Sequence, residues 1–397
     1  MKLNKLFLPT LFILITATAC KTHGLKNQQN IPQGNRAISQ NWTLPGFNKA
    51  DDVNPVLKSG NLSFMDPILN KEVLWERKDV FNPAVVVRNG KIYMLYRAED
   101  TIGKYAGTSR IGLAESTDGL HFAKQAHPVL YPDNDPQNKY EWEGGCEDPR
   151  VVEDENGMYM MTYTAYDGDK ARMMVATSKD LQSWQKHGHA FAKADEKYVS
   201  NWSKSGSVIS KYQADGKIVA VKIKGKYWMY WGDTHLWAAT SDDLINWTPV
   251  AMTANDQLPV GIDSGKLLYP ELKIVLSPRK GKFDRDLVEP GPPAMLTEQG
   301  VLLIYNSRNI PAIGDPTLKE GTYTASQALF DRNDPTKLIQ RMDGYFMRPD
   351  RPYEIEGQVN EVCFLEGLVR FKNQWFLYYG TADSKIAVAI SDAGLKE

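Results

Sequence analysis

Acidic and basic side chains gather in this sequence at positions where apolar runs begin. Glu147-Asp148-Pro149-Arg150 precedes one such run, and Asn82-Pro83 and Glu289-Pro290 precede two others. Carboxyl groups that lie close together and away from water have shifted pKa values, which lets one of them act as a general acid. The alternative is that these Asp-Pro and Glu-Pro pairs only form turns. The sequence therefore offers an acid–base site, provided that the fold brings these strand starts together.

Signatures of other common chemistries are missing from the chain. There is no Gly-x-x-x-x-Gly-Lys-Ser/Thr phosphate loop, no Gly-x-Ser-x-Gly and no His-Glu-x-x-His. The six histidines show no metal-ligand spacing, and we interpret His187 and His189 as loop residues. We therefore expect no metal site and no cofactor.

The candidate residues are embedded in a repeated pattern of short strands. An apolar run, a turn with Gly or Asn and an aromatic run follow one another, and this unit occurs five times. The copies cover residues 83–97, 149–163, 217–231, 293–305 and 361–379. Without any long helical pattern, these copies predict an all-β fold, a five-bladed β-propeller over residues 49–397. A β-sandwich or two stacked β domains is the alternative. In a propeller the blade starts converge on a central channel.

A second motif recurs in the other half of the unit. A strand ends in Ser-x-Asp, and an aromatic residue follows a few positions later. An Asp side chain in such a turn accepts hydrogen bonds from nearby backbone amides. We therefore predict that Asp118, Asp180 and Asp242 are structural residues.

The N-terminus has the pattern of an export signal. Lys2 and Lys5 precede an apolar run at 6–15, which is too short to span a membrane, and small residues lead to Cys20. This predicts a lipoprotein-type signal peptide at 1–20 with Cys20 as the lipidation site; an ordinary cleaved signal is the alternative. Residues 21–48 are polar and without apolar periodicity, which favours a flexible tether. We expect an exported lipoprotein, periplasmic or at the cell surface, with its lipid in the membrane.

The overall charge argues against a polyanionic partner. The chain has 47 basic and 48 acidic residues, a net charge of -1, so we expect no nucleic acid to bind. A neutral ligand such as a sugar fits better. Beyond Cys20 only Cys146 and Cys363 remain, so we expect two buried thiols and no disulfide framework.

Taken together, the motifs at the strand starts resemble glycoside hydrolase family 130, the β-mannoside phosphorylases and β-mannosidases, over about residues 80–390. The pieces that carry the resemblance are Phe81-Asn82-Pro83, Tyr96-Arg97-Ala98-Glu99, Gly145-Cys146-Glu147-Asp148-Pro149-Arg150, Gly291-Pro292-Pro293, Thr297-Glu298-Gln299-Gly300, Tyr305 and Tyr379-Gly380-Thr381-Ala382-Asp383. The resemblance implies a β-mannoside oligosaccharide as substrate. It also implies that Asp148 is the general acid, acting through a sugar hydroxyl. The same resemblance implies that the mannose is bound by Asn82, Arg97, Glu99, Arg150 and Asp383.

The family contains both hydrolases and phosphorylases, and phosphate binding separates them. A phosphorylase needs Arg, Lys and His donors for inorganic phosphate, whereas hydrolysis needs a carboxylate base and a water. Family phosphorylases tend to carry His-Arg and Tyr-His at the ends of two aromatic strands, where this chain has Tyr230-Trp231-Gly232 and Tyr305-Asn306. Glu289 stands where they tend to have glycine. Asp233 follows the first altered strand.

We therefore favour an inverting β-mannosidase, acting on bonds that are perhaps β-1,2-linked. Glu289 is the first choice for the general base and Asp233 the second. Glu289 could equally be a salt-bridge partner for an arginine, and Lys204 could preserve part of an anion site. The alternatives are a phosphorylase of the same family, a five-bladed propeller glycosidase of the arabinanase or β-xylosidase type, and a non-catalytic glycan-binding surface lipoprotein.

Overall fold

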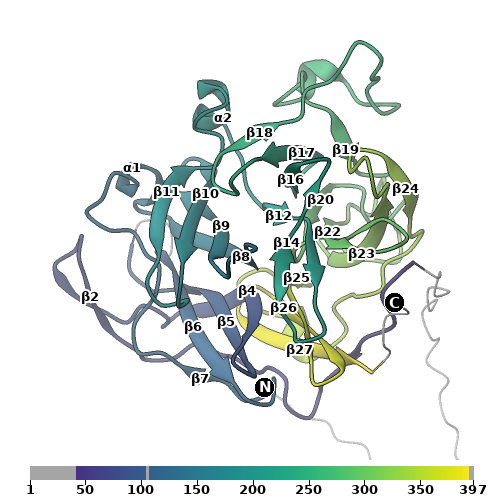
Figure 1. Cartoon of the computed structure of the whole chain (residues 1–397). Coiled ribbons are helices and arrows are strands. Elements are labelled where there is room, and N and C mark those ends of the chain that lie inside the picture. The colour runs from purple at the N-terminus through teal and green to yellow at the C-terminus, as the bar shows by residue number, and fades with distance from the viewer. Residues whose placement is uncertain (1–41, 104–106, 393–397) are drawn as a thin grey trace, which may run out of the picture. The chain divides into compact units, whose positions relative to one another are not determined.

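The structure is a computed structural model that describes residues 42–103 and 107–392. These residues belong to one compact unit, Ala37–Glu397, in which β-strands make up almost all regular structure (Figure 1). Its described helices are short: α1 (Asn138–Glu141), α2 (Glu196–Ser200), α3 (Pro352–Ile355) and the 3-10 helix η1 (Ser264–Lys266). The prediction of an all-β fold is confirmed. No helix in the described part of the chain has the length and apolar character needed to cross a membrane.

The predicted signal peptide at 1–20, with Cys20, lies outside the described residues, as does most of the predicted tether at 21–48. From Trp42 onward, however, the chain is part of the folded body. Trp42 and Leu44 are buried in an apolar cluster, and the Leu44 N–H donates to Gln327 Oε1 at 2.8 Å. The folded body therefore begins earlier than residue 49, because apolar side chains in an otherwise polar segment find a core to pack against.

The first half of the body consists of two antiparallel strand groups. The first group contains β4 (Asp79–Arg88), β5 (Lys91–Glu99), β6 (Ser109–Ser116) and β7 (Ala123–Lys124). The second contains β8 (Gly145–Glu153), β9 (Tyr159–Tyr166), β10 (Ala171–Ser178) and β11 (Gln185–His189). Their order along the chain is also their order in the sheet. Each group thus corresponds to one sequence repeat together with the Ser-x-Asp strand that follows it.

Three further groups follow in the second half. One contains β12 (Ser207–Val208), β16 (Lys226–Trp231), β17 (Leu236–Ser241) and β18 (Trp247–Pro249), with β15 (Lys222–Ile223) and β19 (Ile274–Leu276) attached. The next contains β20 (Leu287–Pro290), β21 (Met295–Leu296), β22 (Val301–Arg308), β23 (Tyr323–Phe330) and β24 (Leu338–Arg341). The last contains β25 (Cys363–Phe371), β26 (Gln374–Thr381) and β27 (Lys385–Ser391), and the N-terminal β1 (Asn48–Lys49) pairs with β27.

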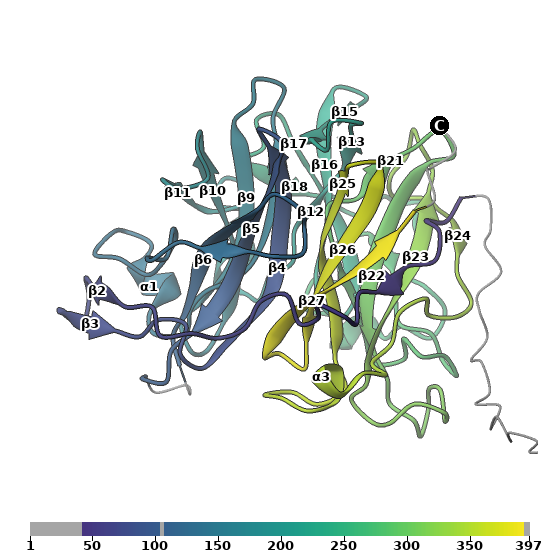
Figure 2. The ribbon, with the colours of Figure 1, turned by 90° about the horizontal axis from the view of Figure 1, so that it is seen from below.

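The remaining strands form two pairs outside these groups. They are the β2 (Phe64–Asp66) and β3 (Lys71–Val73) hairpin, and the pair β13 (Ser210–Tyr212) and β14 (Ile218–Ala220). Figure 2 shows strands of one group, such as β25, β26 and β27, lying side by side. The first strands come together, since β4 contacts both β8 and β25. The strand starts predicted to converge therefore do so for these three groups.

The strands form because their sequences suit sheets that are covered on both faces. Residues 84–87 of β4 are Ala-Val-Val-Val and are all buried, as expected for β-branched residues in a two-sided sheet. Cys146 and Cys363 are buried and free, which confirms that interpretation.

The Ser-x-Asp turns also form as predicted, with one correction. Asp118 Oδ1 accepts from the amides of Leu120 and His121, and Asp180 Oδ1 plays the same part in its own turn. In the third copy the prediction of Asp242 is wrong. Asp243 is the residue two positions after Ser241, and it accepts from the amides of Ile245 and Asn246 in the same turn, whereas Asp242 forms an ion pair with Lys226.

Candidate active site

Backbone bulges aim the predicted side chains into one pocket. The registers of β4 and β8 shift between Phe81 and Pro83 and between Glu147 and Arg150. Within these bulges, Asn82 and Asp148 both have φ 47°, a left-handed conformation that Asn and Asp adopt more readily than most residues. A bulge re-aims a side chain out of the alternating pattern of its strand. The two predicted turns, before Pro83 and Pro149, are therefore bulges, and they bring Asn82 and Asp148 face to face.

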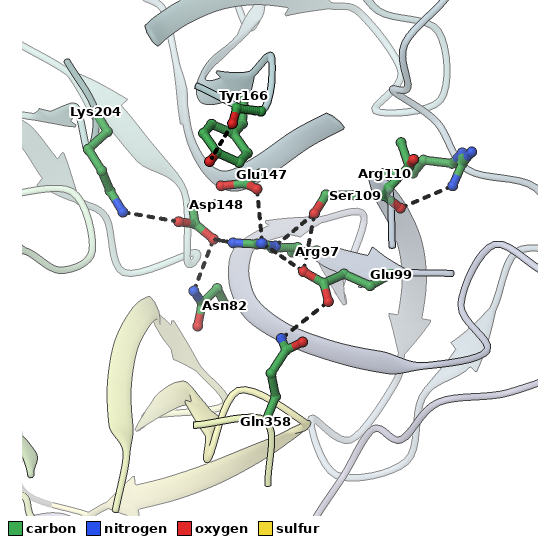
Figure 3. Close-up of polar contacts among 12 residues, drawn as sticks. Asn82, Arg97, Glu99, Ser109, Arg110, Glu147, Asp148, Tyr166, Lys204 and Gln358 are labelled. Carbon is green, nitrogen blue, oxygen red and sulfur yellow. Dashed lines mark hydrogen bonds and ion pairs between the residues drawn. The ribbon is translucent and has the colours of Figure 1, made fainter. Parts of the chain in front are cut away.

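Asp148 is buried and has three polar neighbours (Figure 3). Asn82 Nδ2 donates to Asp148 Oδ1 at 2.9 Å, and Arg97 Nη1 lies 3.2 Å from the same oxygen. Lys204 Nζ lies 3.6 Å from the other oxygen, Oδ2. Among the described residues, Asn82 Oδ1 is buried without a hydrogen-bond partner, so it can accept from a ligand hydroxyl.

Arg97 links Asp148 to two further carboxylates. Its Nη2 lies 2.7 Å from Glu99 Oε1 and 2.9 Å from Glu147 Oε1 (Figure 3). Its guanidinium also covers the Phe81 ring. Burial lowers the pKa of Arg97, but the three carboxylates outweigh it and raise the pKa above its usual value. Arg97 is therefore a fixed cation.

Lys204 bridges the predicted acid and the predicted base. Its Nζ lies 3.2 Å from Glu289 Oε1 as well as 3.6 Å from Asp148 Oδ2, so these two oxygens are no more than about 6.8 Å apart. The Ser205 hydroxyl donates to the same Glu289 oxygen. Burial raises the pKa of Glu289, although Lys204 opposes this.

These residues line a pocket of about 110 Å³. Its walls are Asn82, Arg97, Asp148, Lys204, Glu289, Tyr323, Val362, Phe364 and Asp383. Burial raises the pKa of Asp383 to about 7 against the opposing charge of Arg97. The pocket thus combines three carboxyl groups, two cations and an aromatic rim, a set that can hold a hydroxylated ligand and move protons.

The pKa values of the two adjacent carboxyl groups shift in opposite directions. Burial acts to raise the pKa of Asp148, but Arg97, Lys204 and the Asn82 hydrogen bond together lower it to about 2. For its neighbour Glu147, burial raises the pKa to about 7. Asp148 is therefore the most acidic carboxyl group of this cluster, whereas Glu147 and Asp383 titrate near neutral pH.

Three of the predicted residues lie outside this pocket. Arg150 is buried beside it, where Nε and Nη2 donate to the carbonyl oxygens of Gly291 and Pro290. Glu99 lies behind Arg97 and also binds Lys78. Asp233 lines a neighbouring hollow and accepts from Trp202 Nε1 at 2.8 Å. Arg150, Glu99 and Asp233 thus do not line the pocket that contains Asp148. Of the three, only Asp233 lines the neighbouring hollow.

Sequence reasoning missed Glu366, which lies in the bulge of β25 between Leu365 and Gly367. It is fully buried, and its Oε1 lies 2.8 Å from Arg150 Nη2. Burial raises its pKa well above the usual range, against the opposing charge of Arg150. In the sequence no proline follows Glu366, unlike Asp148 and Glu289, so no turn signal marked it as a candidate. Only the register shift in the structure shows that it lies in a bulge.

Comparison with known proteins finds a family model and relatives that are named as phosphorylases of mannosides. A family model described as β-1,4-mannooligosaccharide phosphorylase matches residues 51–394. The 1,2-β-oligomannan phosphorylase of Thermoanaerobacter sp. is 30% identical over 325 residues, which are 80% of this chain and 90% of the relative. The β-1,2-mannobiose phosphorylase of the same organism is 30% identical over 345 residues, 83% of this chain and 95% of the relative.

Solved structures with higher identity carry hydrolase names. A glycosyl hydrolase from Bacteroides ovatus is 45% identical with a TM-score of 0.83, and the match covers 90% of this chain and 97% of that one. Another structure is described with the words "The GH130 family of mannoside phosphorylases contains glycoside hydrolases that target beta-1,2 mannosidic linkages in Candida mannan". It is 44% identical with a TM-score of 0.83, over 90% of this chain and 97% of that one.

Proposed function

Because the chain belongs to glycoside hydrolase family 130 and acts as an enzyme on β-mannosidic linkages, we propose that it is an inverting hydrolase of β-1,2-linked mannosides. The observation that carries the proposal is the pair of buried carboxyl groups, Asp148 and Glu289, on either side of Lys204. Inverting glycosidases keep their two carboxyl groups roughly 6.5–9.5 Å apart to leave room for a water. Asp148 Oδ2 and Glu289 Oε1 are at most about 6.8 Å apart, so only the lowest part of this range is open to them in this structure.

In the proposed reaction Glu289 takes a proton from a water, whose oxygen forms a bond to the anomeric carbon. The bond from that carbon to the glycosidic oxygen breaks at the same time. Asp148 supplies the proton for the leaving oxygen by way of a sugar hydroxyl, as the family resemblance implies. Since Arg97, Lys204 and Asn82 lower the pKa of Asp148 to about 2, a bound substrate must raise it by displacing water and by weakening these contacts.

Hydrolysis is favoured over phosphorolysis by the charges of the pocket. Both cations in its wall already contact carboxylates: Arg97 binds Glu99, Glu147 and Asp148, and Lys204 binds Asp148 and Glu289. A phosphate would need donors that carboxylates do not neutralise. The 44% identity to a structure whose description names β-1,2-mannoside hydrolases supports the same choice.

A phosphorylase is the second candidate, because the family model and the 30% identical relatives carry that name. Lys204 would then bind phosphate when Glu289 is protonated. Product analysis separates the two activities: purified enzyme is incubated with β-1,2-mannobiose, with and without inorganic phosphate. We expect free mannose at a rate that does not depend on phosphate. Mannose 1-phosphate formed only with phosphate would replace the hydrolase proposal with the second candidate.

The roles of the two carboxyl groups can be tested with leaving groups. We expect Asp148→Asn to lose roughly 10²- to 10⁴-fold in kcat on mannobiose but much less on β-mannosyl fluoride, whose leaving group needs little protonation. Glu289→Gln should lose activity equally on both substrates, since water must be activated in each case. The reverse pattern would exchange the two roles.

For the fold, we infer that the five strand groups are the five blades of a β-propeller. The support is that each group contains strands of one copy of the repeat, that β4 contacts β8 and β25, and that β1 joins the C-terminal group. Such pairing of the two ends of a chain in one sheet is a means of protecting strand edges.

For the location, we propose an exported lipoprotein, periplasmic or at the cell surface, anchored through Cys20. The support is the sequence pattern at 1–20. Metabolic labelling with a radioactive fatty acid should mark the wild-type protein, and Cys20→Ala should abolish the label and release the protein from the membrane fraction. An unlabelled wild-type protein would argue for an ordinary signal peptide.

A further inference from the structure

The first strands of three groups each carry a bulge. Asn82 lies in the bulge of β4, Asp148 in that of β8 and Glu366 in that of β25. These strands come together at β4, which contacts both β8 and β25. Asn82 and Asp148 line the catalytic pocket, whereas Glu366 is fully buried and is not among the lining residues. Glu366 is thus a third bulge residue, and the proposed reaction gives it no part.

Arg150 connects Glu366 to the strands of the proposed acid and base. Its Nη2 lies 2.8 Å from Glu366 Oε1. Its Nη2 and Nε donate to the carbonyl oxygens of residues 290 and 291, at 2.7 and 2.9 Å, directly after Glu289 in the chain. Its Nη1 donates to the carbonyl oxygen of Asp148 at 3.4 Å. One planar guanidinium group, whose donors have fixed directions, therefore spans β8, β20 and β25.

The strands that carry the acid and the base belong to different strand groups. β8 pairs with β6, β9 and β14, whereas β20 pairs with β22. Lys204 joins side-chain oxygens of Asp148 and Glu289, but a lysine is a single charge on a flexible stem. Arg150 joins the backbone beside the same two residues. The distance between acid and base therefore depends on Arg150 as well as on Lys204.

The bulge of β25 is fixed to the strand pair that carries the base. Asn306 Nδ2 donates to the Leu365 carbonyl oxygen at 3.0 Å, and the Leu365 N–H donates to Asn306 Oδ1 at 2.8 Å. Asn306 is also the residue that pairs with Glu289 in the register of β20 and β22. Since Glu366 follows Leu365, its backbone is held from this strand pair, and its side chain can hold Arg150 in turn.

The stability of the fold does not account for Glu366. Its side chain is fully buried, and among the described residues its Oε2 has no hydrogen-bond partner. Burial of a carboxyl group with so few partners costs free energy, and replacement of a buried ion pair by apolar residues is often neutral or stabilising. A function in holding Arg150 explains why such a group lies here.

We propose that Arg150 and Glu366 form a positioning pair, which holds the backbones of the acid and the base at the spacing that attack by water requires. The proposal rests on the proposed hydrolysis, because it takes Asp148 and Glu289 as the acid and the base. It gives Arg150 a positioning role in place of the contact with mannose that the family resemblance implies. Both members of the pair act through other residues and do not touch the substrate.

Glu366→Ala removes the carboxyl group that faces Arg150 Nη2. A catalytic group that is misplaced by about 1 Å can cost roughly 10²-fold in rate, so we expect kcat on β-1,2-mannobiose to fall about 10- to 100-fold. KM should change less than about threefold, because neither member of the pair lines the pocket. Glu366→Gln keeps an oxygen that can face Nη2 and should restore most of the kcat.

Three results with these variants would overturn the proposal. The first is an unchanged kcat in Glu366→Ala. The second is a loss of kcat/KM that comes from KM alone. The third is a loss in Glu366→Gln as large as in Glu366→Ala, because the conservative replacement should hold Arg150.

Glu354 provides the matched control. Like Glu366, it is a glutamate with a fully buried side chain that faces a cation, since its Oε2 lies 2.6 Å from Lys49 Nζ. It is not among the residues that line the catalytic pocket. Glu354→Ala should lower the midpoint of urea unfolding but keep kcat within about threefold of the wild-type value. A loss of kcat equal to that of Glu366→Ala, at a temperature where both variants are folded, would contradict the proposal.

Arg150→Lys tests the same pair if Glu366→Ala does not fold. Lysine keeps the positive charge but lacks the planar fork that reaches residues 290 and 291 together with Glu366. We again expect kcat to fall about 10- to 100-fold with KM close to the wild-type value. Full kcat in folded Arg150→Lys would overturn the proposal.

Product analysis distinguishes failure of this inference from failure of the proposed function. Wild-type enzyme and the variants are incubated with β-1,2-mannobiose, with and without inorganic phosphate. If the wild type forms mannose 1-phosphate and only with phosphate, hydrolysis fails, and a kcat loss in Glu366→Ala but not in Glu354→Ala still supports the positioning of Asp148. If the wild type and Glu366→Ala release free mannose at equal rates without phosphate, the function stands and the inference fails. A wild-type enzyme that forms neither product would overturn both.

Discussion

Replacement of Lys204 by Met tests the electrostatic arrangement of the pocket most directly. Lys204 Nζ lies 3.6 Å from Asp148 Oδ2 and 3.2 Å from Glu289 Oε1, so the substitution removes one cation from two carboxyl groups at once. Met has a similar length and no charge. The expected effect is a rise in the pKa of both Asp148 and Glu289.

The size of this rise follows from the two distances. At an effective dielectric constant near 20, unit charges at such separations attract by about 5 kcal/mol for each pair. This is an upper limit, because water fills the vacated space and Asp148 keeps Arg97 and Asn82 as partners. An opposite charge at this range usually shifts a carboxyl pKa by about 1–3 units. We therefore expect the acidic limb of the kcat/KM profile, which reports the ionisation of the general base, to move up by about 1–3 pH units.

The assay is the rate of mannose release from β-1,2-mannobiose between pH 4 and 9, measured with and without phosphate. Lys204→Met should lose about 10- to 1,000-fold more activity at pH 5 than at pH 8, because one pH unit on a limb is a tenfold change in rate. Lys204→Arg keeps the charge and should keep the limb in place. Urea unfolding of both variants checks that the folded state persists under the assay conditions.

Two results would refute the reasoning. An acidic limb that stays in place in Lys204→Met would show that the cation does not control the base. A normal limb together with a raised KM for phosphate would show that Lys204 binds phosphate, which is the phosphorylase arrangement.

Three other predictions follow from the pocket and the turns. Burial raises the pKa of Glu147 and Asp383 to about 7, from their ordinary values of 4.5 and 3.8, so these groups stabilise the fold at low pH and this contribution is lost as the pH rises to about 7. We expect a lower Tm at pH 8 than at pH 5.5, and Asp383→Asn should reduce the difference; an unchanged difference would contradict the assignment. On activity, ionisation of Glu147 and Asp383 adds two negative charges around Asp148, so kcat/KM should fall above about pH 7, and a plateau to pH 9 would speak against these pKa values. In the third Ser-x-Asp turn, Asp243→Ala should lower the free energy of unfolding by about 1–3 kcal/mol, because it accepts two backbone amides, whereas Asp242→Ala should change it by less than about 0.5 kcal/mol; equal values in urea titrations would refute this distinction.

Local patterns were a sound basis for predicting strands and turns. Val-rich and aromatic runs bounded by Gly and Asn became strands such as β4 and β9, and two of the three predicted Asp turns form at the predicted residue. Such features depend on neighbours a few positions away, which the sequence displays. The error at Asp242 had the same local origin, since two adjacent Asp residues follow Ser241 and only the second one has the right spacing.

The sequence by itself determined the chemical inventory of the site: Asn82 and Asp148 before prolines, Glu289 at a strand start, and Asp383 after an aromatic strand. Only the tertiary structure decided which of these groups share a pocket. Glu289 does, Asp233 lies in the next hollow, and Arg150 is buried beside the unforeseen Glu366. It also decided that the pKa of Asp148 falls to about 2 while that of the adjacent Glu147 rises to about 7. The physical reason is that electrostatic interactions depend on distances of a few ångströms between residues far apart in the chain, and on the burial that their packing creates.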